Sequence, residues 1–207
     1  NTVLDAARSP YLVEGALVVL SGARLTIEPG AVIWFRQLGL IVKGELRING
    51  TEAEPVSFAS LGSNNWKGIF FDKSQTVNQL QYCQISNAEF GIRASASTVN
   101  LKNCIFQDNV WGIVIEEGKT EIHNSLVRTS DKIGIAARKS HLLVKDSVIT
   151  ENGSGGFILE KSKAQIERNN ILNNGNWAIK VVSSANGVKA ANNWWGVNNP
   201  EQTEIIG

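Results

Sequence analysis

The chain has 207 residues, 43% of them hydrophobic, and 20 Lys and Arg against 19 Asp and Glu give a formal net charge of +1. This length can bury a substantial core in one or two domains. The charge balance gives no overall attraction to nucleic acid or anionic membranes. The longest apolar runs, such as residues 38–42, fall far short of the ~20 residues of a spanning helix.

The first sixty residues alternate short apolar runs with glycines and prolines. Candidate bends fall at Gly15, Gly22, Gly30, Gly44 and Gly50, together with Pro29 and Pro55. Such residues separate short strands. Residues 1–60 are therefore expected to form less regular coils that cap one end of the molecule.

From residue 61 a repeat becomes visible. A small residue precedes an aliphatic or aromatic one at Gly68, Gly91, Gly112, Gly134, Gly156 and Ala178, giving successive intervals of 23, 21, 22, 22 and 22 residues. An interval this regular is the signature of a solenoid. We expect regular coils over residues 61–186.

Each interval also contains a second short apolar run, and both runs alternate rather than follow a helical period. Because side chains alternate across a strand, an interior Ile113 and Ile115 place Trp111 inside and turn Gly112 outward. The same phase predicts these further inward residues: Phe90, Ile92, Ala94, Ile133, Ile135, Ala137, Phe157, Leu159, Trp177, Ile179 and Val181.

A repeat of about 22 residues without an amphipathic helix can bury its apolar face by coiling, with each turn hydrogen-bonded ~4.8 Å above the last. The sequence therefore predicts an all-β, single-stranded parallel β-helix of roughly eight coils. A leucine-rich horseshoe fits the repeat length but needs an L-x-x-L-x-L spacing that the chain lacks. A stacked polar ladder is predicted at one bend, from Asn103, Asn124, Asp146, Asn169 and Asn192.

The repeat stops near residue 187, and residues 187–207 are expected to form a C-terminal cap on what is otherwise one domain, residues 1–207. Two adjacent aromatic residues, Trp194 and Trp195, lie in this segment. Large aromatic residues are mostly buried. We expect both to close the core at this end.

The segments "GALVVLSGARLTIEPGAVIWF", "LIVKGELRINGTEAEPVSFAS" and "NNWKGIFF", followed by the Gly-Ile repeats and "NNWWG", carry a family resemblance. The chain resembles the right-handed parallel β-helix repeat proteins of bacterial envelopes and surfaces, within the pectate-lyase-like superfamily. This resemblance covers nearly the whole chain and implies the right hand of the coil and a location in the periplasm, on the outer surface or outside the cell. The superfamily contains polysaccharide lyases, hydrolases and epimerases beside members without assigned chemistry.

Catalysis on this fold would require acidic residues that converge on one face. The outward row four positions after each anchor reads Asp72, Ser95, Glu116, Arg138, Glu160 and Val182. If the protein is a polysaccharide-processing enzyme, the candidates are Glu116, Glu160 and Asp72 with Arg138 or Arg93. The alternating signs favour charge pairing between neighbouring coils instead, and we expect no catalytic residue.

No cofactor and no metal site are expected. The chain has no Met, its two histidines, His123 and His141, are out of register, and no C-x-x-C or H-x-x-x-H spacing occurs. Cys83 and Cys104, 21 residues apart, are expected on neighbouring coils. Buried free thiols are the favoured state and a disulfide is the alternative.

The outward row two positions after each anchor forms a candidate binding strip. It reads Phe70, Arg93, Val114, Ala136, Ile158 and Lys180. A sustained apolar strip on an outer face indicates a docking surface unless a loop of the same chain covers it. The sequence favours a non-catalytic scaffold or binding module for another protein or a second copy, with polysaccharide second, no nucleic acid and no membrane insertion.

Overall fold

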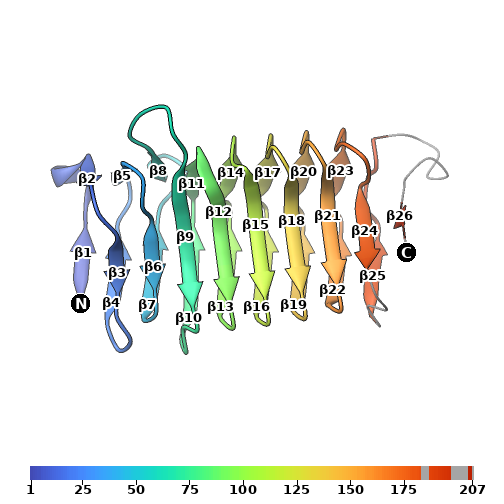
Figure 1. Ribbon diagram of the computed structural model, residues 1–207, viewed down its shortest axis with the longest axis horizontal. Coiled ribbons are helices and arrows are strands. Elements are labelled where there is room, and N and C mark those ends of the chain that lie inside the picture. Colours follow the sequence, from blue (N-terminus) through green and yellow to red (C-terminus); the bar gives the residue numbers. More distant parts are fainter. Residues whose placement is uncertain (183–186, 197–204, 207) are drawn as a thin grey trace.

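In the computed structural model, which describes residues 1–182 and 187–196 and the backbone of 205–206, short strands stack into three parallel sheets (Figure 1). Sheet A contains β1 (Thr2–Leu4), β4 (Arg24–Ile27), β7 (Glu45–Asn49), β10 (Val77–Gln81), β13 (Thr98–Lys102), β16 (Lys119–His123), β19 (His141–Lys145), β22 (Lys163–Glu167) and β25 (Val188–Ala191). Sheet B contains β2 (Tyr11–Val13), β5 (Val32–Phe35), β8 (Val56–Ser60), β11 (Cys83–Ser86), β14 (Ile105–Gln107), β17 (Leu126–Arg128), β20 (Val148–Thr150) and β23 (Asn170–Leu172).

Sheet C faces the viewer in Figure 1. It contains β3 (Leu17–Val19), β6 (Leu40–Val42), β9 (Trp66–Asp72), β12 (Ala88–Ser95), β15 (Trp111–Glu116), β18 (Ile133–Arg138), β21 (Gly155–Glu160), β24 (Ile179–Val182) and β26 (Ile205–Ile206). The chain passes from sheet A to B to C and back, so that each coil adds one strand to each sheet. The predicted parallel β-helix, with its coil of about 22 residues, is confirmed.

The inward rows of the three sheets merge into one continuous apolar interior. Ile113 and Ile115 have no exposed surface, as predicted, and Trp66 fills the interior between Phe35 and Phe58. The Trp66 ring stacks on Phe35 with a centroid distance of 4.4 Å. This dry interior, rather than any helix packing, holds the sheets together.

The predicted phase before the anchor residue is wrong for Phe90, Trp111 and Trp177, whereas Ile133 is buried. A Cβ atom on Gly112 would lie 2.3 Å from the Gly134 carbonyl oxygen and 2.9 Å from Val127 Cγ1, so this position faces the interior together with Ile113. Two successive inward residues break the alternation and turn Trp111 to the outer face, where it is only half-buried. Phe90 and Trp177 are likewise half-buried rather than interior.

The corners of the coil use left-handed backbone. Among the described residues, sixteen non-glycine residues have positive φ. At the corner between sheets A and B they are Tyr82, Asn103, Asn124, Asp146, Arg168 and Asn192. The residue after most of these turns inward and forms a hydrogen bond with the preceding coil. Asn169, which follows Arg168, accepts a hydrogen bond at its Oδ1 from the backbone N–H of Ser147 at 2.9 Å. The polar ladder is thus present, but Asn169 belongs to the inward column and not to the one predicted for it.

The two ends differ. After β1 the chain forms a short 3-10 helix, η1 (Ala6–Arg8), and β1, β2 and β3 pair with the strands of the second coil. At the other end Trp195 packs against the core as predicted, but Trp194 is 46% exposed, contrary to prediction. The rest of the predicted C-terminal cap, residues 197–207, lies outside the described residues except for the backbone of β26.

Candidate functional site: the outer face of sheet C

Strand pairing aligns the predicted strip along the outer face of sheet C. Successive strands pair these residues: Phe70 with Arg93, Arg93 with Val114, Val114 with Ala136, Ala136 with Ile158, and Ile158 with Lys180. We call these six residues the sheet C strip. Val18 and Ile41 extend the row into the first coils, which the sequence did not reveal. Most of these side chains are half-buried, so the face is apolar and accessible.

Aromatic side chains flank the strip, and cations cover their faces. Phe90 and Trp111 stack with their ring centroids 6.4 Å apart. The Arg93 guanidinium carbon lies 5.5 Å from the centre of Phe90 and 5.7 Å from that of Phe70. Lys132 Nζ lies 5.1 Å from the Trp111 ring centre. These contacts are cation–π interactions.

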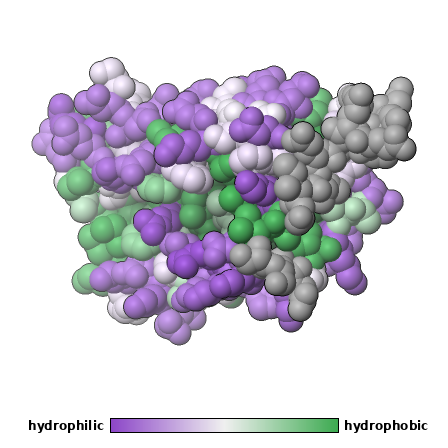
Figure 2. Space-filling model, turned by 45° about the vertical axis from the view of Figure 1, so that its right-hand side comes forward, coloured by the Kyte–Doolittle hydropathy of each residue, from purple (hydrophilic) through white to green (hydrophobic). Residues whose placement is uncertain are grey.

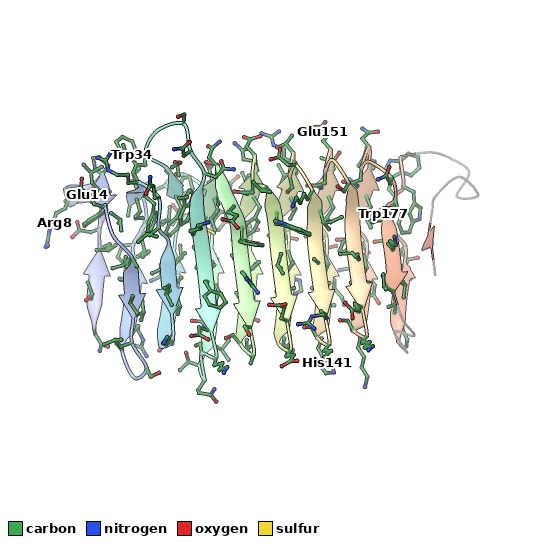
Figure 3. All side chains as sticks on the ribbon, viewed as in Figure 1. Arg8, Glu14, Trp34, His141, Glu151 and Trp177 are labelled. Carbon is green, nitrogen blue, oxygen red and sulfur yellow. The ribbon has the colours of Figure 1, made fainter. Side chains whose placement is uncertain are left out.

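Trp177 repeats this arrangement near the beginning of β24 (Figure 3). Its indole N–H donates to the Phe157 carbonyl at 3.0 Å, and Lys180 Nζ lies 4.6 Å from its ring centre. The ring occupies the space beside Gly155, where a Cβ would lie 2.3 Å from the indole nitrogen. Unbroken alternation would place Phe90, Trp111 and Trp177 inside, so the sequence pattern did not reveal them as surface residues. The glycine that follows Phe90 and Trp111 was the sequence feature that could have indicated the break in alternation.

A hollow of about 290 Å³ opens at the N-terminal half of this face. Its lining includes Leu38, Ile41, Phe70, Phe90 and Arg93. Figure 2 shows hydrophobic residues gathered along the middle of the molecule, bordered by hydrophilic ones. The face therefore offers an apolar band with charged margins.

The three acidic residues considered for catalysis, Glu116, Glu160 and Asp72, lie on the margin of the same face and are not brought together with one another; the structure does bring Arg93 and Arg138 to Glu116. Glu116 pairs with Arg93 at 3.0 Å and with Arg138 at 3.2 Å. Partial burial raises the pKa of Glu116, but the hydrogen bonds and charges of the two arginines outweigh it and hold the pKa below its usual value. A carboxyl group held ionised in this way is poorly suited to donate a proton.

The other two carboxylates stand apart from Glu116. Arg138 lies between Glu116 and Glu160 in the strand register, so the backbones of the two glutamates are about 9.6 Å apart. Asp72 pairs with Lys43 at 3.6 Å. Asp72 and Glu116 therefore form ion pairs between neighbouring coils, and the three acids do not converge.

Residues with metal-binding side chains are likewise dispersed. Within residues 1–182 and 187–196, no three His, Cys, Asp or Glu side chains come together as a metal site would require. His123 and His141 lie in different rows of sheet A. Cys83 and Cys104 lie on neighbouring coils as free, buried thiols with their sulfur atoms 3.3 Å apart. The hydrogen bond with Cys104 and burial raise the pKa of Cys83.

Comparison with known proteins decides the family. A family model described as a right-handed β-helix region matches residues 47–195, which is most of the chain. The chain belongs to the right-handed β-helix family. The hand of the coil, which the spacing of the repeat does not give, is thereby established. The described part of the chain has no helix long and apolar enough to cross a bilayer.

Beyond the family, the similarities are distant. No curated protein matches the chain. Among solved structures, an alginate lyase from Paenibacillus sp. str. FPU-7 is similar, with a TM-score of 0.42 and 10% sequence identity over 95% of this chain and 97% of the lyase chain. A similarity of this size supports no statement about the activity of this β-helix protein.

Proposed function

We propose that this β-helix protein is a non-catalytic scaffold that binds a protein partner along the outer face of sheet C. The observation that carries the proposal is the sheet C strip, a row of six residues on neighbouring strands that is flanked by half-buried aromatic residues. Its centre, Val114, Ala136 and Ile158, is aliphatic, and Arg93 and Lys180 border that centre. Contiguous apolar patches of this kind mark interaction sites. Aromatic residues and arginine are also enriched where protein interfaces gain most of their binding energy.

The geometry favours a protein over a polysaccharide. A sugar ring stacks on the open face of an aromatic side chain, and a cation or another ring already lies near the rings of Phe90, Trp111 and Trp177. The centre of the strip, with Val114 and Ile158, is aliphatic and half-buried. Polysaccharide is the second candidate, and the hollow beside Phe70 and Arg93 is where it would bind.

The charged margin supports a non-catalytic role. A lyase, a glycosidase or an epimerase needs groups that exchange protons with the substrate. Here Glu116 is held ionised between two arginines, and Asp72 pairs with a lysine. Both arrangements favour pairing between coils over proton transfer.

We further propose an extracytoplasmic location, in the periplasm, on the outer surface or outside the cell. Support comes from the resemblance to envelope and surface β-helix proteins. Fractionation of the producing cells tests this proposal. Recovery of the protein in the periplasmic, surface or culture fraction is expected, and recovery with a cytoplasmic marker would contradict it.

Paired lysine substitutions test the docking face. Val114→Lys with Ile158→Lys places two charges on the strip, two strands apart. Ile105→Lys with Val148→Lys is the matched control, because these half-buried residues lie two strands apart on the outer face of sheet B. Circular dichroism establishes that both variants fold.

Binding is then measured with the immobilised chain, an extract of the producing cells, and a panel of neutral and acidic polysaccharides. We expect wild type and control to retain the same protein, and the strip variant to retain at least about tenfold less, since each buried unpaired charge costs more than 1.4 kcal/mol. Cross-links from the retained protein should map to Lys67, Lys132 or Lys180. Equal retention by the strip variant, or binding of polysaccharide alone, would overturn the proposal.

A further inference from the structure

We infer that the partner on sheet C is a second copy of this chain, packed face to face with its solenoid axis reversed. The inference rests on the proposed function, since it names the partner of the same face. The two-fold axis lies in the contact plane, parallel to the strands, midway between β15 and β18. Each outward row then faces the same row of the second copy in the opposite coil order, so that β15 lies opposite β18, β12 opposite β21 and β9 opposite β24.

The central row is complementary to itself in this arrangement. Val114 lies opposite Ala136 of the second copy, so that a larger aliphatic residue meets a smaller one. Phe70 lies opposite Lys180 of the second copy, which brings a cation to an aromatic ring. Arg93 lies opposite Ile158 of the second copy, where its aliphatic stem packs while the guanidinium stays with Glu116. Both charged residues of this row, Arg93 and Lys180, therefore keep a favourable contact.

Most of the charged row at the margin matches as well. Its exception, Asp72, lies opposite Val182 of the second copy and keeps its ion pair with Lys43. Glu116 lies opposite Arg138 of the second copy, and Arg138 lies opposite Glu116 of the second copy. The ion pair within each chain therefore lies against the same ion pair of the second copy, with opposite charges facing each other. Ser95 lies opposite Glu160 of the second copy, where the hydroxyl can donate to the carboxylate. Complementary charges of this kind fix the register of an interface.

The opposite orientation, with the two solenoids parallel, has poorer charge complementarity. A two-fold axis along the solenoid sets the margin row of one copy against the aromatic row of the other. Glu116 and Glu160 would then lie against the positions of Trp111 and Gly155. Glu116 keeps the Arg93 and Arg138 of its own chain in either orientation. Only the antiparallel packing also places Arg138 of the second copy opposite Glu116 and a hydroxyl opposite Glu160. The arrangement of charges therefore favours the antiparallel packing.

The size of the face sets the expected strength. Six strands at ~4.8 Å spacing and about six residues in length give roughly 600 Å² per copy, or about 1,200 Å² in total. This is the lower end of the range for specific protein interfaces. We expect a dimer that dissociates on dilution, with a dissociation constant on the order of micromolar.

Sedimentation velocity over a dilution series tests the self-association. Wild type and the Ile105→Lys, Val148→Lys control should shift from dimer to monomer on dilution. The Val114→Lys, Ile158→Lys variant should remain monomeric at every concentration. A monomeric wild type across the series would overturn the inference, and so would a strip variant that dimerises like wild type.

Cross-linking tests the orientation. Ser95→Cys and Glu160→Cys are made as separate variants in a Cys83→Ser, Cys104→Ser background and mixed before treatment with a short bis-maleimide. Antiparallel packing predicts Ser95→Cys linked to Glu160→Cys. Links between two Ser95→Cys chains should be scarce, since those thiols lie about 14 Å apart along the axis, three strand spacings. Links between like variants alone would overturn the antiparallel arrangement.

The experiments distinguish failure of the second copy as partner from failure of protein docking on sheet C. If wild type is monomeric but a different retained protein is lost from the strip variant, the second copy is excluded and docking on sheet C stands. If the strip variant matches wild type in both assays, docking on sheet C is excluded as well. Binding of polysaccharide by a monomer would replace both protein partners.

Discussion

Thr120 occupies the same inward position on β16 as Val99 on the neighbouring strand β13, and within the described residues its hydroxyl oxygen finds no hydrogen-bond partner. Thr120 is 1% exposed. A buried hydroxyl that lacks a partner destabilises the fold, because its desolvation is not offset by a hydrogen bond. The interior at this point is suited to valine, as the preceding coil shows.

Replacing Thr120 with valine should therefore stabilise the protein. Valine has the shape of threonine, so the substitution removes the unpaired hydroxyl without opening a cavity. We expect the free energy of unfolding to rise by about 1 to 2 kcal/mol. Denaturant unfolding measures it, with Thr98→Val on the outer face of the same sheet as control. A destabilised Thr120→Val protein would show that this hydroxyl is satisfied in solution.

The glycine column of sheet C predicts the opposite effect. A Cβ on Gly112 would lie 2.3 Å from the carbonyl oxygen of Gly134, which is backbone and cannot rotate away. Gly112→Ala should lower the free energy of unfolding by about 2 to 3 kcal/mol through overpacking. Gly15→Ala is the control, because a Cβ there meets nothing within 4 Å. Equal stability of the two variants would contradict the inward orientation of Gly112.

The same glycines explain what the sequence could and could not predict. The coil length and the inner positions of Ile113 and Ile115 were predictable, because a parallel stack repeats the same spacing and the same alternation in every coil. The orientation of the residue before the glycine was not predictable. Gly112 and Ile113 both face inward, but glycine has no side chain and does not change the hydrophobic pattern. Regular alternation therefore places Trp111 on the wrong face.

The alignment of the sheet C strip was predictable for a related reason. Phe70, Val114 and Ile158 follow the glycine, where alternation is regular, so their shared row could be counted from the sequence. The cations over the aromatic rings could not, because Lys132 reaches Trp111 from outside the strand. Contacts of this kind depend on the path of the corner and not on the repeat.

A corner residue provides a third prediction. Ala96 is exposed and has a φ of 43°, a left-handed conformation that a Cβ disfavours. Glycine adopts this conformation without that penalty but adds entropy to the unfolded chain. We expect Ala96→Gly to stabilise the protein by about 0.5 to 1 kcal/mol. Ala53→Gly, at an exposed loop position without positive φ, should instead be neutral or destabilising, and thermal unfolding distinguishes the two.

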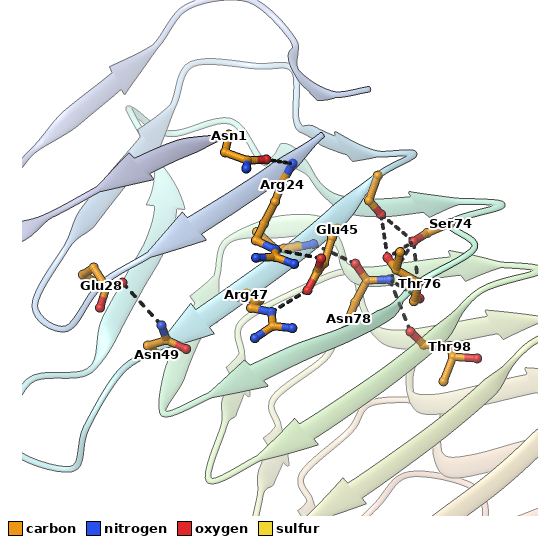
Figure 4. Close-up of polar contacts among 12 residues, drawn as sticks. Asn1, Arg24, Glu28, Glu45, Arg47, Asn49, Ser74, Thr76, Asn78 and Thr98 are labelled. Carbon is orange, nitrogen blue, oxygen red and sulfur yellow. Dashed lines mark hydrogen bonds and ion pairs between the residues drawn. The ribbon is translucent and has the colours of Figure 1, made fainter. Parts of the chain in front are cut away.

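The pH dependence of stability should involve Glu45. Its carboxylate pairs with Arg47 and, at 2.7 Å, with Arg24, as Figure 4 shows. The hydrogen bonds from Arg47 and Arg24 lower the pKa of Glu45 despite its partial burial. A carboxyl group whose folded-state pKa is depressed stabilises the fold above its unfolded-state pKa, and this contribution is lost as the pH falls through the folded value.

Glu45→Gln should therefore lower the melting temperature at pH 7 and flatten its decline on acidification below about pH 4. Melting curves between neutral and acidic pH measure both effects. Glu52→Gln is the control, because Glu52 is exposed in the loop before β8. If the two variants follow the same pH profile, the ion pairs of Glu45 with Arg24 and Arg47 contribute nothing to the acid sensitivity of the fold.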